Sequence, residues 1–124
     1  MKRIIYPGTF DPIHNGHIDI AKRASLLFDE LILVVAINAE KNPLFTESER
    51  IDLIKESVGG VKNIKVSSFN GLVVDYANDA KAVAIIRGLR HVSDFEFEFQ
   101  MAMMNYNLSP NITSMFMMPD EKYI

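Results

Sequence analysis

The sequence predicts an α/β fold, a doubly wound and Rossmann-like sheet of five parallel strands. Two observations predict it. Short apolar runs alternate with longer helical patterns along all 124 residues. The clearest of these runs are apolar throughout, as in strands that are buried on both faces of a parallel sheet. Such an alternation implies parallel strands joined by right-handed helical crossovers.

Five strands are expected, each short and bounded by polar or turn-forming residues. They are predicted at residues 3–6, 31–37, 64–67, 82–86 and 113–118. The second and the fourth contain only apolar residues and are rich in β-branched side chains, whereas the third is weaker. The order of strands and helices shows no linker, repeat or low-complexity segment, so we expect one domain over residues 1–124.

Four helices are expected between these strands, at residues 17–28, 46–58, 72–79 and from 93 to before Pro110. Two of them begin with the pattern of a capping box, in which a hydroxyl residue is followed three positions later by Glu. These boxes are Thr46 with Glu49 and Ser93 with Glu96. The aromatic residues at 95, 97 and 99 cannot share one helix face, so the last helix is predicted to be apolar on several sides and buried between subunits.

Composition excludes several classes of protein. The 13 Lys and Arg residues against 16 Asp and Glu residues give a formal net charge of −3, which argues against a nucleic-acid-coating protein. The absence of Cys excludes disulfides and thiolate zinc sites and favours the cytoplasm. The longest apolar run, residues 31–37, is far below the about 20 residues of a membrane span, and the N-terminal apolar stretch is too short for a signal peptide.

The segment after the first strand, residues 6–17, has the character of a phosphate-binding turn. Two glycines and two prolines shape a turn that runs into the start of a helix, where free backbone N–H groups and the helix dipole favour an anion. Gly16 allows close backbone approach, His17 can direct an imidazole N–H to the same place, and Thr9 adds a hydroxyl. The alternative is a loop in which Gly and Pro only shape the turn and the histidines are solvated.

A zinc site at His14 and His17 is disfavoured. Residues three positions apart on a helix supply two ligands, and at least one more is needed in a chain without cysteine. We therefore expect no metal ligands on the protein itself.

Basic residues follow two other strands at the same edge of the sheet. Lys41 follows the second strand, and Arg87 and Arg90 flank Gly88 after the fourth. Guanidinium groups bind phosphate oxygens in a bidentate manner. Together with His17 and the helix start, these side chains predict a polyphosphate site, for which Glu98 is a further candidate contact. The chain has no P-loop, no Gly-x-Gly-x-x-Gly turn and no Gly-x-Ser-x-Gly elbow.

These segments resemble a known family. The signature of nucleotidylyltransferases, Thr/His-x-Gly-His, is similar to His14-Asn15-Gly16-His17 together with the preceding residues 6–12, and the whole chain resembles the bacterial phosphopantetheine adenylyltransferases. The other segments that carry the resemblance are residues 41–46, 49–50, 71–73, 87–90, 94–100 and 104–105. The resemblance implies a Rossmann-like nucleotidylyltransferase fold and transfer of the adenylyl group of Mg-ATP to 4′-phosphopantetheine, which yields dephospho-coenzyme A and pyrophosphate. It also implies a homohexamer, a dimer of trimers, and binding of dephospho-coenzyme A or coenzyme A.

The resemblance also assigns residues. It gives His17 the catalytic role of stabilising the charge that develops at the α-phosphate. It assigns the phosphopantetheine site to Thr9, Lys41, Val73 and Arg87. It assigns ATP binding to Thr9, Phe10, His17, Gly88, Leu89, Arg90, Glu98, Tyr123 and Ile124. Mg²⁺ is expected to accompany ATP.

The chain departs from the family pattern at its end. In the family, a Ser-rich segment that contacts the ATP phosphates and a C-terminal helix follow the positions matched by Tyr123 and Ile124. The sequence given thus is expected to lack the family's C-terminal helices, and to bind phosphopantetheine or coenzyme A while turning over slowly.

Two alternative functions remain open. One is another nucleotidylyltransferase, which acts on glycerol phosphate or nicotinamide nucleotide. Residues 87–90 and 94–96 argue against it. The other is a nucleotide-binding or coenzyme-A-binding module that is inactive because it lacks the tail.

Overall fold

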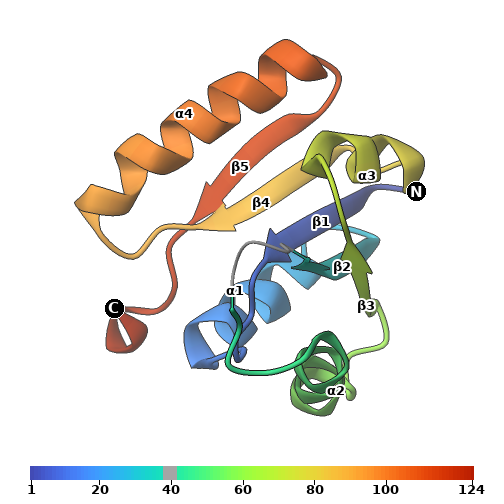
Figure 1. Ribbon diagram of the computed structural model, residues 1–124, viewed down its shortest axis with the longest axis vertical. Coiled ribbons are helices and arrows are strands. Elements are labelled where there is room, and N and C mark those ends of the chain that lie inside the picture. The colour runs from blue at the N-terminus through green and yellow to red at the C-terminus, as the bar shows by residue number, and fades with distance from the viewer. Residues whose placement is uncertain (38–41) are drawn as a thin grey trace.

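The computed structural model describes residues 1–37 and 42–124. Five strands form one parallel sheet in the order β3-β2-β1-β4-β5 (Figure 1). The strands are β1 (Arg3–Gly8), β2 (Glu30–Ala36), β3 (Ile64–Phe69), β4 (Ala84–Gly88) and β5 (Thr113–Met117). The predicted doubly wound, five-stranded α/β fold is therefore confirmed.

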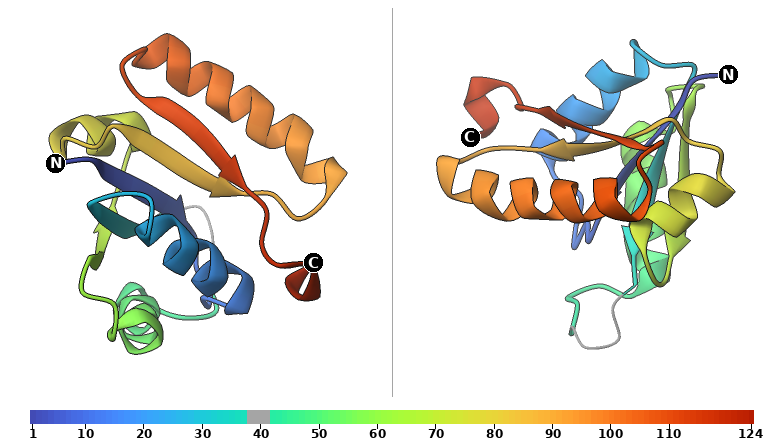
Figure 2. Two further views of the ribbon diagram at one scale, coloured as in Figure 1. Left: turned by 180° about the vertical axis from the view of Figure 1, so that it is seen from behind. Right: turned by 90° about the horizontal axis from the view of Figure 1, so that it is seen from above.

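Helices cover both faces of the sheet (Figure 2). They are α1 (Asn15–Ser25), α2 (Glu47–Val58), α3 (Val73–Asp79) and α4 (Val92–Leu108). Alternate residues of β1 point to opposite faces, as in any strand. Ile4 belongs to a core with α1 and α2, whereas Ile5 packs with Val74 and Ala77 of α3. A 3₁₀ turn, η1 (Glu121–Tyr123), follows β5.

The predicted helix starts were only partly right. The capping box of α2 is confirmed, because Thr46 Oγ1 accepts from the Glu49 N–H at 3.1 Å and the Glu49 carboxylate accepts from the Thr46 N–H at 3.0 Å. The box predicted at Ser93 is wrong. The last helix begins earlier, and the carboxylate of Asp94 accepts from the backbone N–H of His91, at 3.3 Å. The same spacing of three thus occurs two residues earlier along the chain than predicted.

The first helix also begins earlier than predicted, at Asn15, and it ends at Ser25 instead of residue 28. His14 is its N-cap, and the imidazole Nδ1 accepts from the Gly16 N–H at 3.1 Å. Histidine is not among the residues that commonly cap helices, so the pattern placed the start too late.

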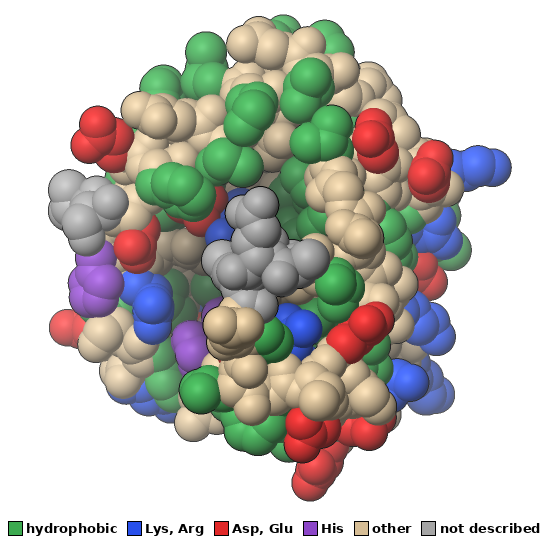
Figure 3. Space-filling view, in the orientation of Figure 1, with side chains coloured by type: hydrophobic (Ala, Val, Ile, Leu, Met, Phe, Trp, Pro, Cys, Tyr) green, Lys and Arg blue, Asp and Glu red, His purple; other side chains and the backbone are tan. Residues whose placement is uncertain are grey.

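Helix α4 has exposed apolar side chains on more than one side, as predicted. Phe95, Phe97 and Phe99 are 49%, 63% and 50% exposed. Figure 3 shows hydrophobic side chains gathered over the part of this face where α4 lies. In residues 1–37 and 42–124, no helix is long and apolar enough to cross a membrane.

Candidate functional site

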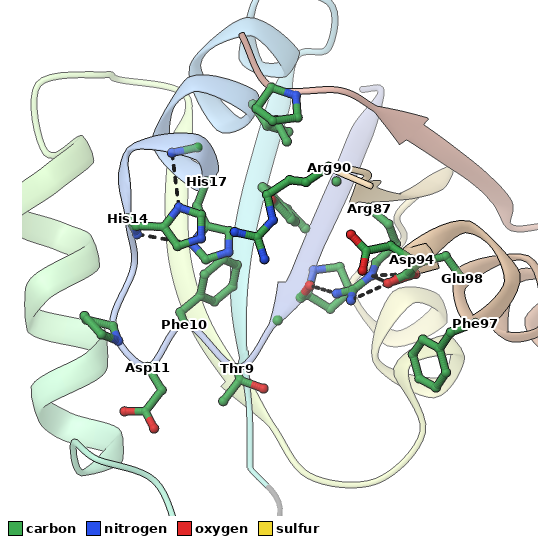
Figure 4. A pocket seen from close by; sticks show the side chains of 18 residues that line it. Thr9, Phe10, Asp11, His14, His17, Arg87, Arg90, Asp94, Phe97 and Glu98 are labelled. Carbon is green, nitrogen blue, oxygen red and sulfur yellow. Dashed lines mark hydrogen bonds and ion pairs between the residues drawn. The ribbon is translucent and has the colours of Figure 1, made fainter. Parts of the chain in front are cut away.

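The site lies at the carboxyl ends of β1 and β4, where the order of strands in the sheet changes direction. In open α/β sheets this is where ligands bind. Two cavities open here, of about 560 and about 300 Å³. Both cavities are lined by Pro7, Gly8, Thr9, Arg87, Phe97 and Glu98, which therefore form a shared wall. Figure 4 shows the larger cavity from close by.

The larger cavity, termed the charged cavity, is lined by the first turn, by α1 and by the segment after β4. Its Asp, His and Arg side chains beyond the shared wall are Asp11, His14, His17, Arg90 and Asp94. Gly88 and Phe10 also line it. Arg90 is exposed at the surface, and Figure 4 shows its guanidinium directed toward the two histidines. Phosphate is the kind of group that such a combination of guanidinium and helix start can bind.

His17 is held as a neutral hydrogen-bond donor. Its Nδ1 accepts from the backbone N–H of His14 at 3.2 Å, so the ring proton is assigned to Nε2. Burial, followed by the neighbouring His14 and Arg90, lowers the pKa of His17 to about 3. The ring packs edge-on against Phe10, with 4.9 Å between centroids. At neutral pH the side chain can thus donate one N–H without carrying a charge.

His14 stacks on His17, with ring centroids 3.6 Å apart. Burial and then Arg90 lower the pKa of His14 below its ordinary value. Its Nδ1 is used by the Gly16 N–H, so the imidazole caps α1. Within the part of the chain that the structure describes, no group of three or more His, Asp or Glu residues is arranged to hold a metal ion.

An ion pair forms the centre of the shared wall. Arg87 Nη2 lies 2.8 Å from Glu98 Oε1, and Arg87 Nε donates to both carboxylate oxygens at 3.1 Å. Arg87 Nη1 donates to the carbonyl of Pro7. Glu98 is only 7% exposed. Since a guanidinium has five N–H groups, Arg87 keeps donors for a ligand while being fixed by its partners.

The smaller cavity, termed the apolar cavity, lies between the sheet, α3 and α4. Beyond the shared wall its lining is mostly apolar, and comprises Ala36, Phe69, Val73, Ile85, Met101, Ala102, Asn105, Ser114 and Phe116. Val73 is the first residue of α3. The cavity can take an uncharged chain, with Asn105 and Ser114 as its polar contacts.

The predicted site residues are partly brought together. Thr9 and Arg87 line both cavities, and Glu98 joins them in the shared wall. Leu89 lines neither, and its N–H donates to the carbonyl of Met117 at 2.9 Å. Tyr123 and Ile124 are also outside both linings, although the Tyr123 Cβ lies close to Gly16. Lys41 lies outside the described residues.

Sequence reasoning missed two residues that hold the first turn in place. The Asp11 carboxylate accepts from the backbone N–H groups of Leu44 and Phe45, at 2.7 and 2.9 Å. Nothing in the sequence distinguishes this aspartate from a solvated one. Arg50, on α2, donates to the carbonyl of Thr9 at 3.0 Å. The burial of Arg50 could have been predicted from the sequence, because it lies four residues before the apolar Ile54 and so on the same, buried face of the helix.

Comparisons with known proteins agree with this geometry. Residues 5–124 match the cytidylyltransferase-like family. A phosphopantetheine adenylyltransferase of Caldanaerobacter subterraneus subsp. tengcongensis is 52% identical over 123 residues, which are 99% of this chain and 77% of that protein.

Solved structures give the same fold. The lipopolysaccharide core biosynthesis protein of Thermoplasma volcanium GSS1 is 26% identical, with a TM-score of 0.71 over 98% of this chain and 99% of that one. A bifunctional NMN adenylyltransferase/ADP ribose pyrophosphatase of Francisella tularensis has a TM-score of 0.69 at 12% identity, over 94% of this chain and 37% of that one. On the strength of the first relative's identity and coverage, the chain belongs to the phosphopantetheine adenylyltransferase family, among the cytidylyltransferase-like proteins.

Proposed function

We propose that this protein transfers the adenylyl group of ATP to 4′-phosphopantetheine, giving dephospho-coenzyme A and pyrophosphate. The observation that carries the proposal is the pair of adjoining cavities, one charged and one apolar, with Thr9 and Arg87 in their shared wall. ATP brings a triphosphate, which suits the charged cavity. Phosphopantetheine brings one phosphate on a largely uncharged arm, which suits the apolar cavity and its wall. Membership of the family supports the same assignment.

The reaction needs no nucleophile from the protein. An oxygen of the phosphopantetheine phosphate attacks the α-phosphorus of ATP and forms a new P–O bond. The bond between the α-phosphorus and the oxygen that bridges to the β-phosphate breaks, and pyrophosphate leaves with its electron pair. Catalysis of such an in-line displacement depends chiefly on positioning and on charge stabilisation.

The side chains of the charged cavity divide this work. His17 donates its Nε2–H to the α-phosphate, where negative charge grows during the transfer. Arg90 binds the ATP phosphates. Phe10, Gly88 and Glu98 complete the ATP site. Leu89, Tyr123 and Ile124, which line neither cavity, are proposed as further ATP contacts.

The acceptor phosphate is held at the shared wall. Thr9 and Arg87 bind it there, with Lys41 as a further contact. Val73 lines the path of the pantetheine arm in the apolar cavity. The attacking oxygen is thereby presented to the α-phosphate across the wall, which converts an encounter of two substrates into a reaction within one complex.

Mg²⁺ acts in this proposal as part of the substrate Mg-ATP. Magnesium in nucleotide enzymes is commonly held by one or two carboxylates and by the phosphates themselves. Activity should therefore be lost on addition of EDTA and return with excess Mg²⁺.

We extend the proposal to assembly and location. The exposed aromatic and apolar side chains of α4 are suited to contact with further copies of the chain, and a homohexamer built as a dimer of trimers is the proposed assembly. Light scattering coupled to size exclusion tests it, since a monomer would contradict it. A cytoplasmic location is proposed because ATP is abundant there.

The test is pyrophosphate release with defined pairs of substrates. ATP with 4′-phosphopantetheine should release pyrophosphate, and CTP, GTP or UTP in place of ATP should release much less. ATP with nicotinamide mononucleotide and CTP with glycerol phosphate test the other nucleotidylyltransferases. Pyrophosphate release with only one of those two pairs would contradict the proposal and assign the protein that activity instead. Tight binding of dephospho-coenzyme A without any pyrophosphate release would identify a binding module.

A further inference from the structure

Arg50 is an unusual buried cation. It lies in the first turns of α2 and is only 4% exposed. No ion pair to it occurs in residues 1–37 and 42–124. Its Nη1 donates to two backbone carbonyls, Thr9 at 3.0 Å and Ala36 at 3.4 Å, and its buried Nε has no partner in the described part of the chain. Burying a guanidinium without a carboxylate partner costs free energy, which its hydrogen bonds to two carbonyls offset only in part.

The two carbonyls belong to the strand exits that border the site. Ala36 is the last residue of β2, and Thr9 directly follows β1. Arg50 thus connects the two neighbouring strand exits through its hydrogen bonds. It does so from outside the site, since it lines neither the charged nor the apolar cavity. A side chain that only filled space at this position of α2 could be as apolar as Ile54.

The residue after Thr9 has a strained backbone that the hydrogen bond from Arg50 can stabilise. Phe10 has φ of +48°, in the left-handed region that residues other than glycine rarely adopt, and it is only 2% exposed. A backbone of this kind is energetically unfavourable and persists only where its surroundings hold it. The carbonyl of Thr9 belongs to the same peptide unit as the nitrogen of Phe10. The hydrogen bond from Arg50 therefore holds the peptide plane on which this φ depends.

The Phe10 ring connects this turn to the His17 imidazole. Its ring packs edge-on against Tyr6, at 5.4 Å between centroids, and against His17, at 4.9 Å. A turn that relaxed at Phe10 would remove one side of the packing around the His17 imidazole. The Nε2–H would then lose its fixed direction into the charged cavity.

We propose that Arg50 is a positioning residue, which holds the strained Thr9–Phe10 turn by its carbonyl and thereby fixes the His17 imidazole against Phe10. The kinetic consequences rest on the adenylyl transfer proposed above. The structural consequence for His17 does not.

The test compares three variants. Arg50→Met removes the guanidinium and keeps a long side chain. Arg50→Lys keeps the charge, but its ammonium ends one bond short of the position of Nη1, the atom that donates to both carbonyls. Lys55→Met removes a charge from the exposed face of the same helix. Histidine side chains are followed by NMR during a pH titration. The wild-type protein and Lys55→Met should keep His17 neutral to about pH 5, while both Arg50 variants should raise its titration midpoint toward the ordinary value of about 6.5.

Kinetics separates positioning from a merely structural role. Both Arg50 variants should lower kcat about 10-fold to 100-fold and change either KM less than about threefold, because a misplaced catalytic group acts on the transition state. Adding Arg50→Lys to His17→Ala should lower kcat no further, since the two changes remove the same interaction.

Several results would overturn the proposal. One is a folded Arg50→Lys with wild-type His17 titration and wild-type kcat, because the charge alone would then suffice. Full additivity with His17→Ala is another. If Arg50→Met fails to fold, as judged by thermal denaturation, Arg50→Lys alone decides. If the wild-type protein releases no pyrophosphate, the proposed function fails, and the NMR titration still decides the role of Arg50.

Discussion

The two cavities share six residues and differ in almost everything else. The charged cavity adds two histidines, an arginine and two aspartates to the shared wall, and lies against the start of α1. The apolar cavity adds the inner faces of α3 and α4, with Val73 and Met101 among its lining. One edge of the sheet can thus offer two unlike binding surfaces side by side. The charged side chains that the larger cavity adds lie on the turn after β1, at the start of α1 and between β4 and the start of α4, whereas the apolar cavity adds residues of the sheet, of α3 and of α4.

The wall between the cavities belongs to both. Arg87 is fixed there by Glu98 and by the carbonyl of Pro7, so its guanidinium is pre-oriented before any ligand binds. Pre-orientation lowers the entropy lost on binding. It also means that a change at Arg87 affects both cavities, whereas changes at Arg90 or Val73 affect one.

Loss of His17 should have the strongest effect on turnover and would show that the reaction takes place in the charged cavity. His17→Ala should lower kcat by about 10²–10³ while changing the KM for ATP little, because the lost donor acts on charge that exists only in the transition state. Steady-state kinetics with both substrates measures it. An increased KM for ATP with an unchanged kcat would show that His17 serves binding instead.

The next effect separates the arginines. Arg90→Ala should raise the KM for ATP about 10-fold to 100-fold and leave that for phosphopantetheine unchanged, since one charge-assisted hydrogen bond contributes about 1.5–3 kcal/mol. Arg87→Ala should raise both KM values. It should also lower the melting temperature, because the buried Glu98 loses its partner. Equal effects of both variants on both substrates would abolish the distinction between the cavities.

A smaller effect tests the apolar cavity alone. Val73→Asp places a carboxylate in the cavity at the first position of α3, where the helix dipole tolerates it. It should raise the KM for phosphopantetheine about tenfold without changing that for ATP, by the cost of desolvating a charge. Leu72→Asp is the matched control, because Leu72 is exposed and lies outside both linings. A similar rise in the control would mean that the charge acts at long range.

The smallest effect concerns stability and pH. The folded protein holds the pKa of His17 near 3, below the value of about 6.5 in an unfolded chain. The unfolded state therefore binds more protons at mildly acidic pH, and stability should fall as the pH drops through the window from about 6.5 to 3. Urea unfolding at about pH 7 and pH 5 measures the slope. His17→Gln should show a shallower loss, and an unchanged slope would show that the imidazole is well solvated.

The parallel sheet and most of the charged site residues could be predicted from the sequence, because both depend on local patterns. Fully apolar runs such as residues 31–37 predict buried strands, and the topology of a parallel sheet brings strand exits together. The pairing of Arg87 with Glu98 was not predictable, because the two residues lie on different elements and meet only when α4 packs against the sheet. The tie from Arg50 to Thr9 depends in the same way on tertiary packing. The starts of α1 and α4 were placed too late because their N-caps are His14 and His91, and histidine is not a usual N-cap residue.

The most direct test of a two-cavity site is whether the two substrates bind together. Calorimetry would titrate 4′-phosphopantetheine into the protein alone and into the protein saturated with a non-hydrolysable ATP analogue. Separate cavities predict affinities that agree within about threefold, or tighter binding in the presence of the analogue. Dephospho-coenzyme A, which joins the two substrates in one molecule, should displace both. Displacement of phosphopantetheine by the ATP analogue would place the two substrates in the same cavity and contradict the account.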